Sequence, residues 1–571
     1  MFGVTLQRGR CACTTRLATG LLAASMSSSA IGATVFVDAS TGNDANLGVS
    51  WATAVQTIQR AEQIADAGDS IFVANGVYLP GAASQGSSFE PLSLVRYFGN
   101  WPGSDQDTVD ALDERNPLDG AQESILEGAI PDGANPPVHA LHVVQAEGVS
   151  DVIYLDGFVI EGGRAVDSTA PVVDPDAGRG AGMWIKSSLV DLVMCQFRDN
   201  EAGVSDCDDS VVGQGGAIAV AAPTAGSLGA GEGIIAVRLM NCVLTNNEAH
   251  WNASGGAIFV SATASLQAIN SVFVDNKATG DSCEINGTTQ YNPAFGGAIT
   301  AGGICLVQHC TMLNNAVVSD DPGLGVDALG RSAFVSLYGG LAFENSIGWQ
   351  TGTLIGTDEV ASDVSTAVAL VTSTLKDGDY GSTTADPLFV NAPSDLRLQS
   401  SSPCIDTASS GVTVALEDDR DIDHDGQAFN NDGTIPGLHK YGEPVPDRDL
   451  AYRLIRCAPD QGAYEYSWGC DESDLKQGDV DRNYRVNFQD LLYILNAWGQ
   501  IGGAEDVNGS GVVDFGDILV VLTDWGVCGS TDPSCSGEIS QGSIQECINL
   551  YGTNPVQLEK CIESMFLNGT P

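Results

Sequence analysis

The sequence predicts a mainly β solenoid, in which the chain winds into stacked coils, followed by small helical segments. Two phrases that recur through its middle predict this fold. The first is rich in glycine and reads GAGMWI at 180, GGAIAV at 215, GGAIFV at 255, GGAITA at 296 and GGLAFE at 339. The second reads MCQFRDN at 194, NCVLTNN at 241, NSVFVDN at 270 and HCTMLNN at 309. Copies of the first phrase lie 35 to 43 residues apart, which is typical of a solenoid coil and too long for a hairpin array.

The second phrase has the period of two that a strand with one buried face shows. Its inward members are expected to stack in the core of successive coils: Cys195 with Phe197, Cys242 with Leu244, Ser271 with Phe273, and Cys310 with Met312. The asparagine that ends each copy falls at a turn, where its amide can hydrogen-bond the coils above and below. The sequence therefore predicts an asparagine ladder of Asn200, Asn247, Asn276 and Asn315.

Together the two phrases resemble the repeats of polymorphic outer-membrane proteins and of related, pectate-lyase-like β-helices. The resemblance extends to TVFVDASTGND at 34, DPLFV at 386 and DQGAYEY at 460, so it covers residues 34–466 and implies a right-handed parallel β-helix there. A capping helix is expected to cover the open end of the first coil, because Trp51, Val55, Ile58 and Ala65 fall on one helical face.

The fifteen cysteines are of different kinds. Cys195, Cys242 and Cys310 fit small core residues better than bridges or metal ligands. Cys207, Cys283 and Cys305 lie outside the repeat and could form bridges. Cys404 and Cys457 flank an acidic stretch, EDDRDIDHDG at 417, across which they could pair and which could itself hold a calcium ion.

Two twelve-residue stretches near the end of the chain place oxygen-bearing side chains at positions 1, 3, 5, 9 and 12. They are DVDRNYRVNFQD, residues 479–490, and DVNGSGVVDFGD, residues 506–517. A loop curled around a hard cation would use these groups as ligands, whereas without a cation the carboxylates would repel one another. The expected ligands are Asp479, Asp481, Asn483, the Arg485 carbonyl, Asn487 and Asp490 in the first loop, and Asp506, Asn508, Ser510, the Val512 carbonyl, Asp514 and Asp517 in the second.

An apolar stripe at helical spacing follows each loop: Leu491, Ile494, Leu495 and Trp498, then Ile518, Val521, Leu522 and Trp525. This duplicated loop and helix resembles a type I dockerin over residues 478–527. The resemblance implies two bound Ca2+ ions and a cohesin-like partner, contacted by Phe488 and Phe515 unless these side chains pack in the core. Both loops end in Asp where an EF-hand has Glu, and Tyr484 replaces the glycine at position 6 of the first, so the second loop is expected to bind calcium more tightly.

The net charge of −49 over 571 residues excludes nucleic acid and an anionic membrane surface as partners. Residues 1–33 combine arginines with a short apolar run that ends in small residues, which predicts a cleaved secretory signal rather than a membrane span. Residues 467–477 are expected to be a linker, and residues 528–571 a helical hairpin that Cys547 and Cys561 could bridge. The predicted signal therefore implies a secreted or cell-surface protein.

Two kinds of function fit this organisation. A β-helix that binds carbohydrate or surface partners needs only the solenoid and the attachment module. A polysaccharide lyase or glycoside hydrolase, delivered or scaffolded by the dockerin-like module, also needs a cleft with aromatic side chains and a basic residue beside carboxylates. The sequence assigns no catalytic residue, because the coil cations are few and scattered among carboxylates: Arg179, Lys186, Arg198, Arg238 and Lys277.

Overall fold

A computed structural model of the chain describes residues 33–81, 84, 86–103, 123–130, 138–148, 152–165, 176–203, 211–221, 236–262, 264–280, 282–285, 288–291, 294–319, 334–336, 341–349, 360–362, 368–371, 373–375, 382–409, 447–448, 459–466, 476–480, 485–486, 488–503, 505–524 and 526–527. Three segments discussed above lie outside these ranges: residues 1–32 of the predicted signal, the acidic stretch at 417–426 and the predicted hairpin at 528–571.

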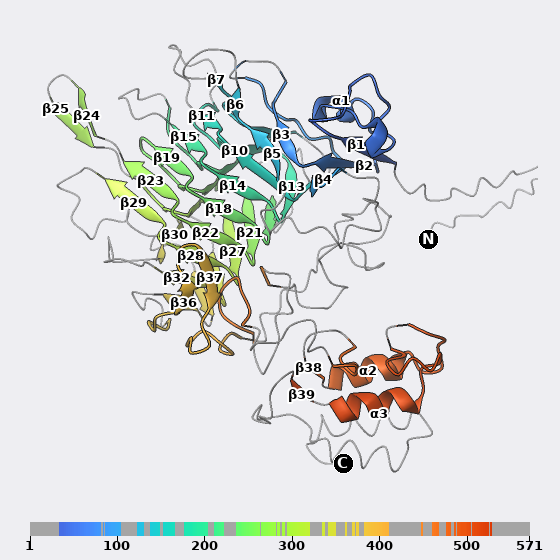
Figure 1. The fold of residues 1–571 in the computed structure, drawn as a ribbon. Helices are drawn as coiled ribbons and strands as arrows, with labels where there is room; N and C mark the ends of the chain where they lie inside the picture. Colours follow the sequence, from blue (N-terminus) through green and yellow to red (C-terminus); the bar gives the residue numbers. More distant parts are fainter. Residues whose placement is uncertain are drawn as a thin grey trace, which may run out of the picture. The chain divides into compact units, whose positions relative to one another are not determined.

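Residues 34–375 form the predicted right-handed parallel β-helix, in which four parallel sheets run along the coils (Figure 1). Sheet A contains β1 (Thr34–Val37), β2 (Ser70–Ala74), β4 (Arg96–Trp101), β9 (Val152–Asp156), β13 (Leu189–Val193), β17 (Val237–Met240), β21 (Ser265–Ile269), β27 (Ile304–Gln308), β31 (Leu341–Glu344) and β34 (Val368–Val371). Sheet B contains β3 (Gly76–Tyr78), β5 (Ser124–Glu127), β10 (Phe158–Glu161), β14 (Gln196–Arg198), β18 (Val243–Thr245), β22 (Val272–Val274), β28 (Thr311–Leu313), β32 (Ile347–Trp349) and β35 (Thr374–Leu375).

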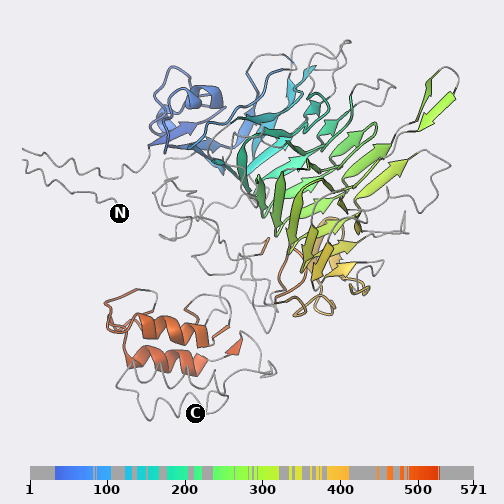
Figure 2. The same ribbon diagram turned by 180° about the vertical axis from the view of Figure 1, so that it is seen from behind.

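The other two sheets complete the coils, and seen from behind the strands follow one another in chain order along the solenoid (Figure 2). Sheet C contains β8 (Val144–Glu147), β12 (Met183–Lys186), β16 (Ile218–Ala221), β20 (Ile258–Val260), β26 (Ile299–Ala301), β30 (Phe334–Ser336) and β33 (Val360–Ser362). Sheet D contains β11 (Arg164–Ala165), β15 (Glu201–Ala202), β19 (Glu248–His250), β23 (Lys277–Gly280) and β29 (Ala316–Ser319).

The remaining elements are short antiparallel pairs and helices. The pairs are β6 (Ala129–Ile130) with β7 (Val138–His139), β24 (Ser282–Ile285) with β25 (Thr288–Tyr291), β36 (Phe389–Asn391) with β37 (Asp395–Leu398), and β38 (Arg485–Val486) with β39 (Gly526–Val527). The helices are η1 (Trp51–Thr53), α1 (Ile58–Glu62), α2 (Phe488–Asn496) and α3 (Phe515–Asp524).

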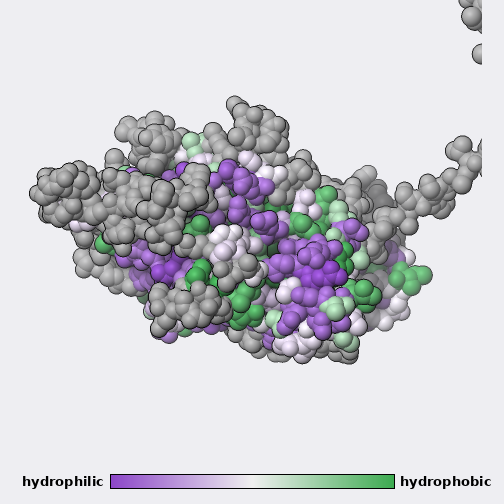
Figure 3. Space-filling view, turned by 90° about the horizontal axis from the view of Figure 1, so that it is seen from above, coloured by the Kyte–Doolittle hydropathy of each residue, from purple (hydrophilic) through white to green (hydrophobic). Residues whose placement is uncertain are grey.

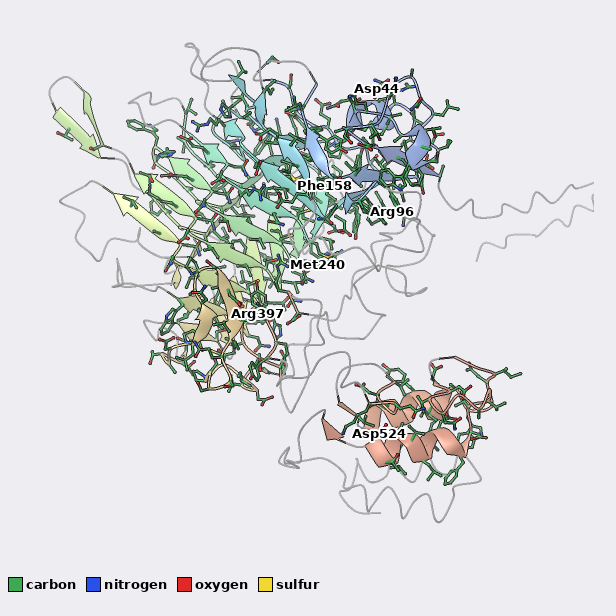
Figure 4. All side chains as sticks on the ribbon, viewed as in Figure 1. Asp44, Arg96, Phe158, Met240, Arg397 and Asp524 are labelled. Carbon is green, nitrogen blue, oxygen red and sulfur yellow. The ribbon has the colours of Figure 1, made fainter. Side chains whose placement is uncertain are left out.

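Inward side chains of the strands form one core along the solenoid. Phe158 of β10, labelled in Figure 4, is among them. The predicted stacks are confirmed, because every member is buried in this core or against it: Cys195, Phe197, Cys242, Leu244, Ser271, Phe273, Cys310 and Met312.

The predicted asparagine ladder is confirmed. Asn247 Nδ2 donates to Phe197 O and to Asn276 Oδ1, both at 2.9 Å, and its backbone N–H donates to the same Oδ1 at 3.1 Å. Asn200 donates in the same way to Asn247, and Asn276 to Asn315. The four residues are at most 1% exposed, so each amide satisfies backbone groups that water does not reach.

The residue before each ladder asparagine adopts the left-handed conformation that turns the corner. Asp199, Asn246, Asp275 and Asn314 have φ of 54–55°. Asn and Asp adopt this region more readily than other residues that carry a Cβ. The recurring Asp-Asn and Asn-Asn pairs are therefore one corner residue followed by one ladder residue.

The glycine-rich phrase keeps its register in four of its five copies. The first four precede or begin β12, β16, β20 and β26 of sheet C. GGLAFE at 339 instead leads into β31 of sheet A, so its expected place in the repeat is wrong. The strand of sheet C in that coil is β30, which the glycine phrase does not precede.

The cap of the first coil is shorter than predicted. Val55 and Ile58 are buried in the solenoid core and Ala65 packs against it, as expected. Trp51 does not share that face: it is buried in a different cluster with Phe36, on the outer side of sheet A. A single helical face over residues 51–65 is wrong, because η1 and α1 are separate elements.

Cys195, Cys242 and Cys310 are free, buried thiols in the described coils, as predicted. Cys305 is also free and faces the core from β27, so the expectation that it lies outside the repeat is wrong. Cys404 is a free, buried thiol whose Sγ lies 3.6 Å from Thr374 Oγ1, which contradicts its predicted bridge. The side chains of Cys207, Cys283 and Cys457 lie outside the described part of the chain.

The cap contains a carboxyl group with a raised pKa. Glu62, at the end of α1, accepts a hydrogen bond from Tyr97 Oη at 3.2 Å, and burial raises the pKa of Glu62 to about 7. The folded protein therefore holds this proton more tightly than the unfolded chain, in which the pKa is 4.5. The resulting contribution to stability is complete below the unfolded pKa and is lost as pH rises through 7.

We expect the wild-type protein to lose about 2 kcal/mol of stability between about pH 5 and about pH 8 through this group. This is less than the full difference in pKa would give, because Glu62 is partly exposed. The variant Glu62→Gln cannot ionise and should lack this part of the pH dependence. Urea unfolding of both proteins across this range measures the difference. Parallel pH profiles would contradict the raised pKa.

Candidate functional site

The second candidate calcium loop, residues 506–517, curls around its own oxygen atoms. Asp506 Oδ1 accepts from Ser510 N at 2.9 Å and Oδ2 from Gly511 N at 2.8 Å. Asn508 Oδ1 also accepts from Ser510 N, at 2.8 Å. Gly511 has φ of 93°, a left-handed conformation that favours glycine and makes the sharp turn expected at position 6.

The twelfth residue closes this loop. Asp517 is fully buried, and its two oxygens accept from Asn508 N at 3.0 Å and from Asp514 N at 2.8 Å. A Cβ on Gly516 would lie 2.5 Å from Asn508 Nδ2 and 3.0 Å from Asp514 Oδ1, so these two side chains meet over a glycine. The side chains at positions 1, 3 and 12 thus accept N–H groups of the loop, and those at positions 3 and 9 meet over Gly516, whereas the hydroxyl at position 5 donates to Val512 O at 3.0 Å.

The donor set of the second loop fits a hard cation. Carboxylate, amide, hydroxyl and carbonyl oxygens are the ligands that calcium takes, and an oxygen that accepts one N–H keeps a lone pair for a metal. In the described ranges, no three His, Cys, Asp or Glu side chains form a group that could hold a metal ion by themselves. Calcium in this loop would therefore also need the oxygens of Asn508, Ser510 and Val512.

The first candidate loop, residues 479–490, is described only in part. Asp490 is fully buried and its Oδ1 accepts from Val480 N at 2.8 Å, and Asp479 is 6% exposed. These contacts join the two ends of the loop. Asp481, Asn483 and Asn487 lie outside the described residues, and of Arg485 only the backbone, in β38, is described.

The two helices pack together through the predicted apolar stripes. Leu491, Ile494, Leu495, Ile518, Val521 and Leu522 are buried in one cluster, and Trp498 packs against it. Phe515 also packs against this cluster, which favours its core role over a partner contact. Trp525 and the side chain of Phe488 lie outside the described residues.

The ends of this two-helix unit are joined by contacts that the sequence did not indicate. Arg485–Val486 of the first loop pairs with Gly526–Val527, which follows α3. In the second loop, Val513 exchanges hydrogen bonds with the segment after α2, at 2.9 Å with Gly499 N and 3.0 Å with Gln500 O. Each loop therefore pairs with the segment that follows the other loop's helix.

The outer face of sheet A carries an aromatic row with one ring per coil. Phe36, Phe72, Phe98 and Tyr154 have successive ring centroids 5.8, 5.6 and 5.6 Å apart. The last three are at most 3% exposed, so the row forms a second apolar cluster outside the solenoid core rather than an open platform. A strand that is buried on both faces carries apolar residues at successive positions, as SIFVA at 70 does, and this is the sequence signal that could have indicated the row.

Beyond Tyr154 the outer face of sheet A becomes charged. Asp191 and Arg238 occupy the next two coils in register with Tyr154, whose register partner in β4 is Arg96 rather than Phe98. Arg238 NH2 donates to Asp191 Oδ2 at 2.9 Å. The two side chains are 0% and 2% exposed. On the same face Asp156, also fully buried, accepts from Tyr154 Oη at 3.3 Å.

The coil cations form ion pairs with carboxylates, and one of them, Arg238, is buried. The pairs are Arg179 with Asp176 at 3.1 Å, Lys186 with Glu147 at 2.9 Å and Asp176 at 3.0 Å, Arg198 with Glu123 at 3.0 Å and Glu161, Arg238 with Asp191 at 2.9 Å, and Lys277 with Glu248 at 2.5 Å.

The described surface seen in Figure 3 mixes hydrophilic and hydrophobic patches.

Comparison with known proteins gives only distant likenesses. No family model and no curated protein matches the chain. Among solved structures, pectate lyase Pel9A is 12% identical with a TM-score of 0.34, over 76% of this chain and 98% of that one. A rhamnogalacturonan lyase is 13% identical with a TM-score of 0.31, over 63% of this chain and 91% of that one. Neither likeness carries an argument about activity.

The helices that the structure describes include none long and apolar enough to span a membrane.

Proposed function

We propose that this chain is a secreted or cell-surface β-helix protein that binds carbohydrate or surface partners, and that residues 478–527 attach it through a calcium-dependent, dockerin-like module. The observation that carries the proposal is the second loop. Asp506, Asn508 and Asp517 accept N–H groups within it, Asp517 is fully buried, and its turn is made at Gly511. The first loop would hold a second Ca2+ through Asp479 and Asp490.

Calcium would supply positive charge within the acidic second loop, which contains no Lys or Arg. Asp506, Asp514 and Asp517 belong to one loop, and the cation would offset the repulsion between their carboxylates. The ion would also fix the loop to the first turn of α3, so part of the folding free energy of the unit would come from metal binding. Lys476, whose Nζ donates to Asp524 O at 2.8 Å, reaches the other end of α3 instead.

A cohesin-like partner would contact the apolar side chains that this unit exposes. Ile501 is 88% exposed, Leu519 42% and Val512 41%. Residues of this kind form the buried centre of protein interfaces. They replace Phe515 as the candidate partner face, because Phe515 packs inward.

A polysaccharide lyase or glycoside hydrolase is the second candidate function. The buried pair Asp191–Arg238, beside Asp156 and Tyr154, is the specific observation in its favour. Burying a charged pair generally costs more than an apolar pair of the same volume, so such groups are often retained for function.

A screen of the full-length protein against immobilised neutral and acidic glycans, with calcium or with a chelator, tests both candidates. We expect saturable glycan binding that persists in chelator, because the solenoid carries it. New reducing or unsaturated ends would favour the enzyme. Absence of binding to every glycan would contradict the carbohydrate part of the proposal.

A further inference from the structure

The outer face of sheet B carries three charged residues in register on successive coils. Glu127 of β5 pairs with Glu161 of β10, and Glu161 pairs with Arg198 of β14. Side chains that share a register position on neighbouring parallel strands lie side by side, about 4.8 Å apart at the backbone. Two carboxyl groups therefore stand next to each other, and one of them also faces an arginine.

Arg198 holds one of these carboxylates and orients it. Its Nε donates to Glu161, and its NH1 and NH2 donate to the two oxygens of Glu123, both at 3.0 Å. Burial alone would lower the pKa of Arg198, but the hydrogen bonds to Glu123 and Glu161 raise it. Glu161 is thus a fixed, ion-paired carboxylate.

Glu127 is in a different environment. Its Oε1 accepts from Ala129 N at 2.7 Å, and among the residues that the structure describes no cation forms an ion pair with it. Burial raises the pKa of Glu127, and the neighbouring charge of Glu161 adds to the increase. Burial therefore favours the protonated form of Glu127, whereas Glu161 is held in an ion pair with Arg198.

Solvent reaches this cluster. The side chains of Glu161, Glu123 and Arg198 are 20%, 24% and 30% exposed. A Cβ on Gly162 would lie 2.4 Å from Glu127 Oε1 and clash with it, so a glycine at this position gives the carboxyl group its room. His139 of β7 also borders it, with Nδ1 2.7 Å from Gly162 O.

We propose that Glu127 and Glu161 are the acid/base and the nucleophile of a retaining glycoside hydrolase site on the outer face of sheet B. This rests on the proposed binding of carbohydrate. A carboxyl group whose protonated form burial favours, beside a carboxylate held by an arginine, is the pair that such hydrolysis needs. Retention is expected rather than inversion, because side chains in register on neighbouring strands lie close together, about 4.8 Å apart at the backbone.

The reaction uses both groups twice. Glu161 attacks the anomeric carbon while Glu127 gives its proton to the departing glycosidic oxygen, which leaves a glycosyl ester on Glu161. Glu127, now a carboxylate, then takes a proton from water as the water oxygen attacks the anomeric carbon. The ester bond breaks, the sugar is released, and Glu161 and Glu127 return to their first states.

Sheet D offers a matched control pair with the same geometry. Glu201 and Glu248 are also register partners on neighbouring strands. Each has its own cation, since Arg164 lies 2.9 Å from Glu201 and Lys277 lies 2.5 Å from Glu248. That pair lacks the contrast between a paired and an unpaired carboxyl group, so its amide variants should leave cleavage unchanged.

The test uses the full-length protein on xylan, arabinan, galactan and polygalacturonate, and on the 4-nitrophenyl glycosides of their sugars. We expect new reducing ends, a product of retained anomeric configuration, and a loss of at least about 100-fold in rate for Glu127→Gln and for Glu161→Gln. Glu201→Gln and Glu248→Gln should stay within about twofold, because neither touches the reacting atoms.

Azide separates catalysis from folding. Sodium azide should restore turnover of a 4-nitrophenyl glycoside by Glu161→Ala, since it can replace the missing nucleophile. Azide should not raise the rate of Glu248→Ala, which keeps both carboxyl groups of the proposed site. Glycan binding without cleavage anywhere in the panel would overturn this site and leave the proposed binding function standing. Inversion, or full activity of Glu127→Gln, would also overturn it. Absence of both binding and cleavage would remove the proposed function as well.

Discussion

Replacing Asp191 by alanine is expected to lower the free energy of unfolding of the solenoid by about 3 to 5 kcal/mol. The change removes the carboxylate that accepts from Arg238 NH2 and leaves the guanidinium, 2% exposed, in a site that water does not reach. Urea unfolding followed by tryptophan fluorescence measures the loss.

The double variant Asp191→Leu with Arg238→Met is the control. It removes both charges together and keeps apolar volume, so it should be much closer to the wild type than Asp191→Ala is. Asp275→Asn removes the charge of an exposed corner residue but keeps its preference for the left-handed conformation, so it should change the free energy of unfolding by less than about 0.5 kcal/mol. An effect of that size for Asp191→Ala would show that the pair does not stabilise the coils.

Asn247→Ala should cost about 3 kcal/mol, because it removes an acceptor and a donor from a buried network. The Nδ2 and backbone N–H of Asn200 both lose Asn247 Oδ1, at 3.0 and 3.3 Å, and Phe197 O loses its donor. Each group stays buried after the change. Thermal and urea unfolding of the full chain give the cost.

Asn246→Gly is the matched control for the ladder. Asn246 is the neighbouring residue in the same sequence phrase, but it is exposed and has φ of 54°, a conformation that glycine adopts freely. We expect no loss of stability from this change. Equal destabilisation by both substitutions would mean that the corner turn, and not the amide ladder, holds the coils in register.

The sequence predicted the parts of the fold that depend on repetition. A stacked coil must present the same inward residue at the same place, so Phe197, Leu244, Phe273 and Met312 could be aligned without knowing how each coil was closed. The ladder asparagines followed from the same register. GGLAFE at 339 failed because a glycine pair does not by itself say which sheet the following strand joins, and here that strand is β31 of sheet A.

The rest depended on contacts between residues far apart in the sequence. The aromatic row of sheet A and the pair Asp191–Arg238 need the register of several coils, and alternation within one strand cannot show it. Glu127 and Glu161 are likewise 34 residues apart and meet only because β5 and β10 are neighbours. By contrast the second candidate calcium loop is local, and its candidate ligands could be named from spacing alone.

A calorimetric calcium titration of the full-length protein, with helix content and tryptophan fluorescence followed in parallel, tests the central claim that residues 478–527 are a calcium-dependent module. We expect two saturable sites, a gain of helical signal from α2 and α3, and loss of the tighter site in Asp506→Ala. Ser409→Ala, in the solenoid part, should keep both sites. No saturable binding at millimolar calcium and no change in helix content would contradict the claim.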